Sequence, residues 1–342
     1  MARIAAEMTG LVLVTGATGY VGSVLVPVLA GNGWRIRALD TETFGNSISQ
    51  TPNVEFIKGS IMDYGLLPPV MKGVSHVIHL AGIVTDELVD MNPVLAEQVN
   101  VQATGALLSE AKKAGVGRFI YASSSSVYGT QPEGVEATEE TIPQPMTIYA
   151  ETKLRAEKAV LYANSPSLVT TAVRSATCCG PAPRMRLDTI VNTFSAQAWF
   201  KGRITVHGGG QWRTNIHVRD IARLYASMLH WPVEAIGGQV FNAAKEAMRA
   251  SDIAILVQRA VGKSRDGMSV EVLTDATRQD PRHYRMGGRV LWKQCGWFPI
   301  LRIEDAVRDN VRFFKAGGIR DPDDAVYYNT RRMAGVVAQQ QS

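Results

Sequence analysis

Cysteine is scarce in this chain of 342 residues, which contains only three. Two of them, Cys178 and Cys179, are neighbours in the sequence, so they cannot form an ordinary framework of disulfides. No spacing of Cys and His resembles a zinc site either. We therefore expect no metal site and a reducing, cytoplasmic location.

Long hydrophobic runs are also missing. No uninterrupted apolar stretch reaches the roughly 18 residues that a membrane-spanning helix needs, and the N-terminus has no pattern of a secretory signal. The formal net charge is only +5, and Lys and Arg are scattered rather than gathered into a basic stripe. We expect a protein that binds neither membranes nor nucleic acid but can accept a small anionic ligand.

The sequence does contain regular alternation. Through residues 1–180, short runs rich in Val and Ile alternate with helical patterns, which is typical of parallel strands buried on both faces. This rhythm predicts the α/β class, with a doubly wound parallel sheet of the Rossmann type. The expected strands are Leu11–Thr15, Arg35–Asp40, Val54–Lys58, His76–Leu80, Arg118–Ser123 and Thr170–Arg174, and the expected helices between them are Tyr20–Ala30, Asn92–Ala114 and Tyr149–Asn164.

The rhythm breaks after Gly180. Helices are expected at Thr189–Lys201 and Asp220–Leu229, and a strand at Gln239–Ala243 should rejoin the sheet. We therefore predict a Rossmann domain at 1–180, rejoined by about 214–244, and a smaller interleaved C-terminal lobe at 181–213 and 245–320. Residues 321–342 are expected to form a C-terminal tail that frays from Arg331 onward.

A glycine-rich stretch, TGATGYVG at residues 15–22, directly follows an apolar strand and opens a helix. Gly16 permits a sharp turn, Gly19 lets the backbone approach a pyrophosphate, and Gly22 lets the helix pack closely on the strand. The N-terminus of the helix would then point at the phosphates. We predict a dinucleotide site here, with Tyr20 and Val21 also beside the cofactor.

Asp40 ends the second predicted strand, where an acidic side chain accepts hydrogen bonds from an adenosine ribose. Its carboxylate would repel a 2′-phosphate, and residues 41–43 include no Arg to bind one, so NAD is favoured over NADP. His79 is expected to be a packed strand residue. Further cofactor contacts are expected after the third and fourth strands, from Ile61, Asp63, Leu80, Ala81 and Gly82.

Four consecutive serines, residues 123–126, follow the apolar run of the fifth strand. Taken alone, such a cluster is more often a polar turn whose hydroxyls bond nearby backbone. Tyr149 and Lys153 lie four residues apart, on one face of a predicted helix. A lysine ammonium stabilises a nearby phenolate and makes the tyrosine a usable general base, while a serine or threonine hydroxyl orients the substrate oxygen.

Together, TGATGYVG, Asp40, HLAG, SSSSVYG and YAETK resemble the extended short-chain dehydrogenase/reductase family, which includes UDP-galactose 4-epimerase and related sugar-nucleotide enzymes. The resemblance covers roughly residues 10–315. It implies NAD as the cofactor, a nucleoside-diphosphate sugar as the substrate, and a homodimer built on the helices near 92–114 and 149–164. It also implies that Ser124, four residues before the Tyr of VYG, is the catalytic hydroxyl beside Tyr149 and Lys153.

The same resemblance assigns further positions. Ser123 would lie near the cofactor, Ser125 would line the substrate pocket, and Asn100 would bond backbone that orders the active-site strand; otherwise Asn100 is a helix-surface residue. On the substrate side it implies roles for Thr177, Arg184, Asn192, Arg213 and Arg282. For Arg184 and its neighbour Arg186, a solvated arginine-rich loop is an equally good interpretation.

Ser125 and Ser126 also bear on the type of reaction. Members of the family that remove water from the sugar carry an Asp-Glu pair at these positions, because elimination needs a further acid and base. The remaining reaction types are oxidation, reduction and epimerisation. The leading hypothesis is a 4-epimerase that oxidises C4 of the sugar transiently. The alternatives are a sugar-nucleotide dehydrogenase or ketoreductase with exchangeable NAD and a non-catalytic cofactor-binding regulator; Tyr149 and Lys153 disfavour the regulator.

Overall fold

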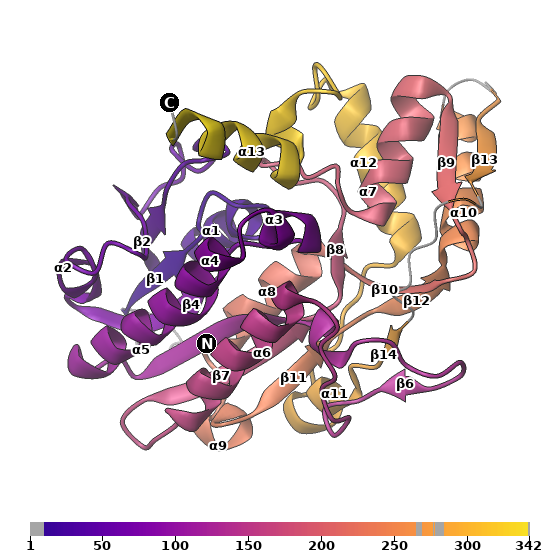
Figure 1. Ribbon diagram of the computed structural model, residues 1–342. Helices are drawn as coiled ribbons and strands as arrows, with labels where there is room; N and C mark the ends of the chain where they lie inside the picture. The colour runs from indigo at the N-terminus through magenta and orange to yellow at the C-terminus, as the bar shows by residue number, and fades with distance from the viewer. Residues whose placement is uncertain (1–9, 265–268, 276, 278–283, 341–342) are drawn as a thin grey trace.

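The computed structural model describes residues 10–264, 269–275, 277 and 284–340 (Figure 1). Its centre is a seven-stranded sheet in the order β11-β7-β5-β4-β1-β2-β3, and all neighbouring strands are parallel. The predicted doubly wound sheet is confirmed, including the strand near residue 240 that rejoins it. The strands are β1 (Leu11–Thr15), β2 (Arg35–Asp40), β3 (Val54–Lys58), β4 (Val74–His79), β5 (Arg118–Ser124), β7 (Val169–Ser175) and β11 (Val240–Ala243).

Helices cover both faces of this sheet, which explains why β1 is apolar and buried along its whole length. Val12 and Val14 of β1 pack into the core on one face, and Leu11 and Leu13 pack into the core on the other. The first face carries α1 (Gly22–Gly31), α8 (Val218–Met228), α9 (Val233–Ile236) and α11 (Arg289–Cys295). The second carries α2 (Leu67–Met71), α5 (Thr104–Lys113) and α6 (Ile148–Tyr162). Among the described residues, no helix has the length and apolar character needed to cross a membrane.

The single helix expected at Asn92–Ala114 is divided in the structure. It begins as α4 (Pro93–Glu97), continues as a π-helical turn at Gln98–Ala103, and ends as α5. Asn92 caps α4 by accepting a hydrogen bond from the backbone N–H of Leu95 (2.9 Å), which also separates α4 from the preceding α3 (Asp86–Met91). The π-helical turn contains Asn100, whose contacts are described below.

The smaller lobe is built mainly from segments after β7, and it packs around its own apolar core, which includes Ile204, Ile253 and Val307. Three small sheets lie in the described part of this lobe. They are formed by β8 (Thr177–Cys179), β10 (Trp212–His217) and β12 (Glu246–Arg249), by β9 (Arg203–His207) and β13 (Glu271–Asp275), and by β6 (Glu136–Ala137) and β14 (Arg285–Met286). Its helices are α7 (Ile190–Ala196), extended by a π-helical turn at Gln197–Lys201, α10 (Ala250–Ser264) and α12 (Ile303–Lys315). Single turns of 3₁₀ helix lie at Ser125–Tyr128 and Ala325–Tyr327.

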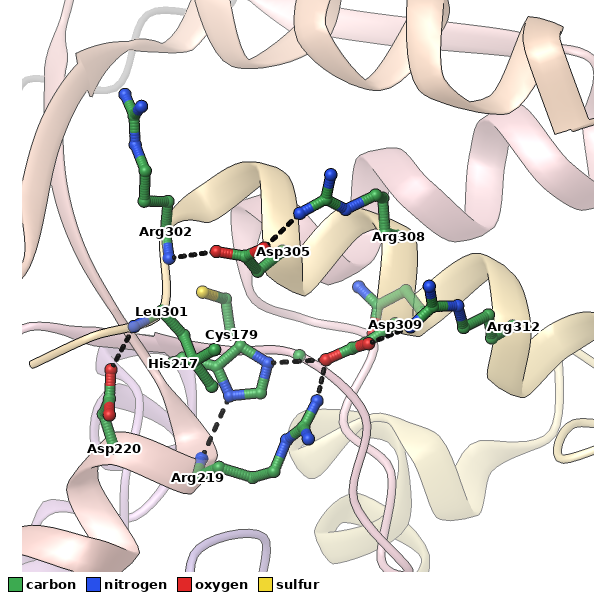
Figure 2. Close-up of polar contacts among 12 residues, drawn as sticks. Cys179, His217, Arg219, Asp220, Leu301, Arg302, Asp305, Arg308, Asp309 and Arg312 are labelled. Carbon is green, nitrogen blue, oxygen red and sulfur yellow. Dashed lines mark hydrogen bonds and ion pairs between the residues drawn. The ribbon is translucent and has the colours of Figure 1, made fainter.

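A polar network joins the start of α8 to α12 (Figure 2). His217 caps α8, because its Nδ1 accepts a hydrogen bond from the backbone N–H of Arg219 (3.0 Å). Its Nε2 lies 3.4 Å from a carboxylate oxygen of Asp309, which also pairs with Arg219. Asp220 accepts a hydrogen bond from the backbone N–H of Leu301 (2.7 Å). These contacts fix the last helix of the lobe to a helix that covers the sheet.

The structure corrects the expectation of a fraying C-terminal tail. Residues Asn329–Gln340 form helix α13, which lies close to α3 (Figure 1). The Arg332 Nε donates a hydrogen bond to the backbone carbonyl of Thr43, 2.7 Å away, in the loop after β2. The sequence could not reveal this contact, because it joins residues 289 positions apart.

Candidate active site

A cavity of about 1040 Å³ opens beyond the carboxyl ends of the parallel strands. Its walls combine the loops after β1, β2, β3 and β4 with the serine stretch, the start of α6 and part of the smaller lobe. The strand order reverses between β1 and β4, and both strands end at this cavity. Open α/β sheets bind their ligands at this kind of position.

The glycine-rich turn has the shape that a dinucleotide requires. Gly16 has a φ of +70°, and a Cβ there would lie 2.7 Å from the backbone nitrogen of Ala81. A Cβ on Gly22 would lie 2.3 Å from the carbonyl oxygen of Gly16, so neither position accepts a side chain. The turn therefore keeps the start of α1 open to a phosphate. The residues of the turn that line the cavity are Gly16, Gly19, Tyr20, Val21 and Gly22.

Asp40 lines the same cavity at the end of β2. Its Oδ2 accepts a hydrogen bond from the backbone N–H of Thr18 (3.0 Å), and its Oδ1 accepts one from the backbone N–H of Glu42 (2.8 Å). These bonds fix the carboxylate at the place predicted for the ribose. Ile61 lines the cavity as well, but Asp63 is exposed and is not among the lining residues; its Oδ1 accepts from the backbone of Gly65 and Leu66.

Leu80, Ala81 and Gly82 line the cavity after β4, and buried Asn100 holds the loop that follows them. The Asn100 Oδ1 accepts from the backbone N–H of Ile83 (2.8 Å), and its Nδ2 donates to the Ile83 carbonyl (3.0 Å) and to Thr152 on α6 (3.1 Å). Asn100 thus ties this loop to the helix that carries Tyr149. It does not lie on the helix surface.

His79 is a packed strand residue, as expected. It is fully buried and forms hydrogen bonds with Thr15 (2.7 Å) and Thr104 (2.9 Å). Burial, reinforced by the charge of Lys153, lowers the pKa of His79 to about 3, so the imidazole is neutral at physiological pH.

The three predicted catalytic side chains meet in the cavity. Tyr149 and Lys153 lie four residues apart on α6, and Ser124 is the last residue of β5. Ser124 is close enough to Tyr149 to lower its pKa, and the Ser124 Oγ lies 3.1 Å from the Oγ of Ser126. The Lys153 Nζ lies 4.3 Å from the centre of the Tyr121 ring.

Burial dominates the electrostatics of this group. It raises the pKa of Tyr149, against the opposing effects of the nearby Ser124 hydroxyl and the charge of Arg186. It lowers the pKa of Lys153 to about 7, against the opposing charge of Glu157. A tyrosine that is protonated at rest therefore lies on the same helix face as a lysine that can gain or lose a proton near neutral pH.

Glu157 is a residue of this region that the sequence analysis missed. Its side chain is only 1% exposed, it accepts a hydrogen bond from Ser123 (2.5 Å), and it forms an ion pair with buried Arg174 (2.6 Å). Arg174 also donates to the Tyr128 hydroxyl (2.8 Å). The sequence spacing could have indicated Glu157, because it follows Lys153 by four residues and so lies on the same helix face. Ser123 lines the cavity while its hydroxyl points to this buried pair.

On the substrate side, Ser125, Thr177 and Arg213 line the cavity, as predicted. Ser125 donates a hydrogen bond to the hydroxyl of Tyr284 (3.1 Å), a lining residue that the sequence analysis did not identify. Arg282 lies outside the described residues.

Two predicted substrate residues are placed elsewhere. Asn192 does not line the cavity; it is fully buried, its Oδ1 accepts from the backbone N–H of Gly180 (2.9 Å), and its Nδ2 donates to the Tyr20 hydroxyl (2.9 Å). Arg184 does line the cavity, but beside α1, where its backbone N–H donates to the Ser23 hydroxyl (3.3 Å).

Arg186, by contrast, is close enough to Tyr149 to affect its pKa. The interpretation of a solvated arginine-rich loop is wrong, because Arg184 is buried and Arg186 nearly so.

Comparison with known proteins identifies the family. The model of the NAD dependent epimerase/dehydratase family matches residues 12–244, which is more than half of the chain. The chain belongs to this family. The predicted family, the enzyme class and NAD as the cofactor are thereby confirmed.

Two known proteins of those compared illustrate a resemblance along most of the chain. A UDP-glucose 4-epimerase of Mycolicibacterium smegmatis is 28% identical over 315 residues, covering 89% of this chain and 98% of the relative. The structure of MoeE5 in complex with UDP-glucuronic acid and NAD is 26% identical, with a TM-score of 0.78, and the match covers 90% of this chain and 99% of that chain. A 3 beta-hydroxysteroid dehydrogenase/Delta 5-->4-isomerase of Mycobacterium tuberculosis is 34% identical, but over 48% of this chain and 46% of the relative. The chain spans between about a third and a half of the length of its 34% identical relatives.

Proposed function

We propose that this protein is an NAD-dependent 4-epimerase of a nucleoside-diphosphate sugar. The observation that carries the proposal is the meeting of Ser124, Tyr149 and Lys153 in one cavity, with serines rather than carboxylates directly after Ser124. This arrangement provides one hydroxyl-activating group and no adjacent acid-base pair for elimination. The full-length similarity to a UDP-glucose 4-epimerase supports the same assignment.

In the proposed reaction, the same side chains serve both the oxidation of the sugar and the reduction that follows. Ser124 orients the C4 hydroxyl of the sugar, and Tyr149 takes the proton from that oxygen as the C4 hydride leaves. Bound NAD supplies the chemistry of accepting this hydride and returning it to the opposite face of the resulting ketone. Tyr149 then returns its proton to the same oxygen, so atoms and electrons balance over the cycle. The ammonium of Lys153 favours the phenolate form that Tyr149 needs before the first transfer and regains after the second.

The proposed nucleoside diphosphate lies toward the smaller lobe. Arg213 on β10 lines that part of the cavity, and Arg186 lies close enough to influence Tyr149. Guanidinium groups bind diphosphates through paired, charge-assisted hydrogen bonds. The UDP-sugar named for MoeE5 and for the M. smegmatis enzyme is the first substrate class to test.

A dehydrogenase that releases its reduced cofactor is the second candidate. It would use the same three side chains, because the first half of the epimerase reaction is an oxidation. The 34% identity to a hydroxysteroid dehydrogenase, over 48% of this chain, favours this candidate.

One incubation separates the two candidates. Purified protein is given UDP-glucose or UDP-galactose, or the corresponding dTDP-, GDP- and CDP-sugars, or a 3β-hydroxysteroid, with and without added NAD. An epimerase interconverts the two C4 epimers without added NAD and without net formation of NADH, whereas Tyr149→Phe does not. An oxidised product that accumulates with equimolar NADH would overturn the epimerase proposal.

We also propose a homodimer. Three large apolar side chains are exposed on α4 and α6, namely Val94 (67%), Ile148 (40%) and Tyr162 (94%). Exposed apolar side chains on neighbouring helices favour a self-complementary contact. Light scattering coupled to size-exclusion chromatography tests this proposal, and a monomer at micromolar concentration would contradict it.

A further inference from the structure

The surroundings of the Arg184 side chain differ from those expected of a residue that binds the sugar nucleotide. It lies between β8 and α7, is only 5% exposed, and lines the cavity. Its guanidinium lies 3.8 Å from the centre of the Phe44 ring and donates a hydrogen bond to the side chain of Asn329. Within the described part of the chain, its Nε is buried without a hydrogen-bond partner. A buried donor left unpaired is costly, so this nitrogen is suited to a ligand that supplies an acceptor.

The neighbours of Arg184 place it at the cofactor end of the cavity. Ser23, which accepts a hydrogen bond from its backbone, directly follows Gly22 at the start of α1. Phe44 lies in the loop after β2, four residues beyond Asp40. Arg184 therefore contacts the helix that follows the glycine-rich turn through its backbone and the loop after Asp40 through its guanidinium, and the charges of Tyr20 and Asp40 both act on its pKa. Burial lowers the pKa of Arg184 to about 10, so the group is still a cation at neutral pH.

Helix α13 holds this arrangement together. Asn329, its first residue, accepts the hydrogen bond from Arg184 and donates its own backbone N–H to Asp188 (3.0 Å). Arg332 donates to the backbone carbonyl of Thr43 in the loop after β2 (2.7 Å). Met333 lines the cavity, and Figure 1 shows α13 lying across the end of the molecule that carries β2 and α3.

We propose that Arg184 binds the diphosphate of NAD and that α13 positions Arg184 and closes the adenosine end of the cavity, which slows cofactor release. A guanidinium pairs well with a diphosphate, whose charge the start of α1 alone neutralises only in part. The proposal concerns NAD binding, which follows from the family, so it stands whether the enzyme proves to be an epimerase or a dehydrogenase.

The test compares fragments of the cofactor. Arg184→Met removes the charge but keeps an unbranched apolar stem against Phe44, and Arg331→Met removes an arginine of α13 that does not line this cavity. Calorimetric titration of the cofactor-free proteins with ADP, NAD and adenosine gives the affinities. We expect Arg184→Met to weaken ADP and NAD binding at least tenfold and adenosine binding less than twofold, while Arg331→Met changes none of them.

A second variant tests the positioning role. Asn329→Ala leaves Arg184 in place but removes its acceptor, so NADH release, followed by fluorescence after dilution, should accelerate at least threefold. If circular dichroism shows that Arg184→Met does not fold, the NADH release rates of Arg184→Lys and Asn329→Ala are compared with that of the wild type instead. Equal release from the variants and the wild type would overturn the proposal. An equal loss of affinity for adenosine and for ADP in Arg184→Met would also overturn it. So would weaker binding of UDP to the NAD-loaded variant with unchanged binding of ADP, because Arg184 would then bind the substrate.

Discussion

Glu157 follows Lys153 by one helical turn on α6, and its carboxylate raises the pKa of Lys153 against the stronger effect of burial. Glu157 is itself held by the ion pair with Arg174 and the hydrogen bond from Ser123. A carboxylate behind the site therefore influences how much of the lysine is protonated near neutral pH. Glu157 acts through Lys153 and is a positioning residue rather than a catalytic one.

We predict that Glu157→Gln shifts the alkaline limb of the pH-rate profile to lower pH. Removing the carboxylate removes the effect that raises the pKa of Lys153, so the ammonium that stabilises the Tyr149 phenolate is lost at lower pH. The measurement is kcat against pH from 5.5 to about 9. The variant also leaves Arg174 without its partner charge, which costs on the order of 3 kcal/mol of stability.

The matched control is Glu97→Gln, which removes a half-exposed carboxylate that pairs with Arg155 on the outer side of α6. It should leave the profile in place. A Glu157→Gln enzyme that loses stability but keeps the wild-type profile would show that Glu157 has only a structural role.

The two serines that flank the catalytic position should behave differently. Ser124 is close enough to Tyr149 to lower its pKa, so Ser124→Ala should lower turnover by roughly 10²-fold. Ser126→Ala should lose little, because the Ser126 hydroxyl contacts Ser124 and is not among the groups that shift the pKa of Tyr149. Steady-state rates of both variants with the substrate found above check this, and equal losses would mean that the assigned register of the serine stretch is wrong.

The parts of the site that could be predicted are those that one short segment determines. A strand, a glycine turn and a helix start are encoded together in residues 11–22, and the turn requires glycine where a Cβ would meet backbone. Tyr149 and Lys153 share a face because of helical periodicity alone. These features therefore appear in the structure where the sequence indicates.

The parts that could not be predicted depend on packing between distant segments. Arg184 contacts Phe44 and Asn329, which lie 140 and 145 positions away in the sequence. The resemblance to the family suggested a ligand contact for Asn192, but its amide bonds groups that include the Gly180 backbone and the Tyr20 hydroxyl. In the sequence, an Asn that binds a ligand looks the same as an Asn that bonds a buried turn.

Cofactor choice should follow from Asp40. Its fixed carboxylate at the end of β2 would repel a 2′-phosphate, so NAD should bind at least tenfold more tightly than NADP, a difference of about 1.4 kcal/mol. Asp40→Asn should lower the ratio of NAD affinity to NADP affinity. Asp63→Asn, which changes a carboxylate that does not line the cavity, is the control and should keep it. Calorimetric titration gives the ratios, and equal affinity of the wild type for the two cofactors would refute the prediction.

Acid should destabilise the protein through His217. Burial, reinforced by Arg219, lowers its pKa to about 4 in the folded state, despite the opposing charges of Asp220 and Asp305, whereas an unfolded histidine has a pKa near 6.5. Between these two values the unfolded chain binds more protons, so stability is complete above about pH 6.5 and falls as the pH drops toward 4, by up to roughly 3 kcal/mol. His217→Asn keeps an acceptor that can cap α8 but removes the titration. Thermal unfolding should therefore show a smaller decrease in Tm from pH 7.5 to pH 5 for the variant than for the wild type. A decrease as large as that of the wild type would show that other groups cause the acid sensitivity.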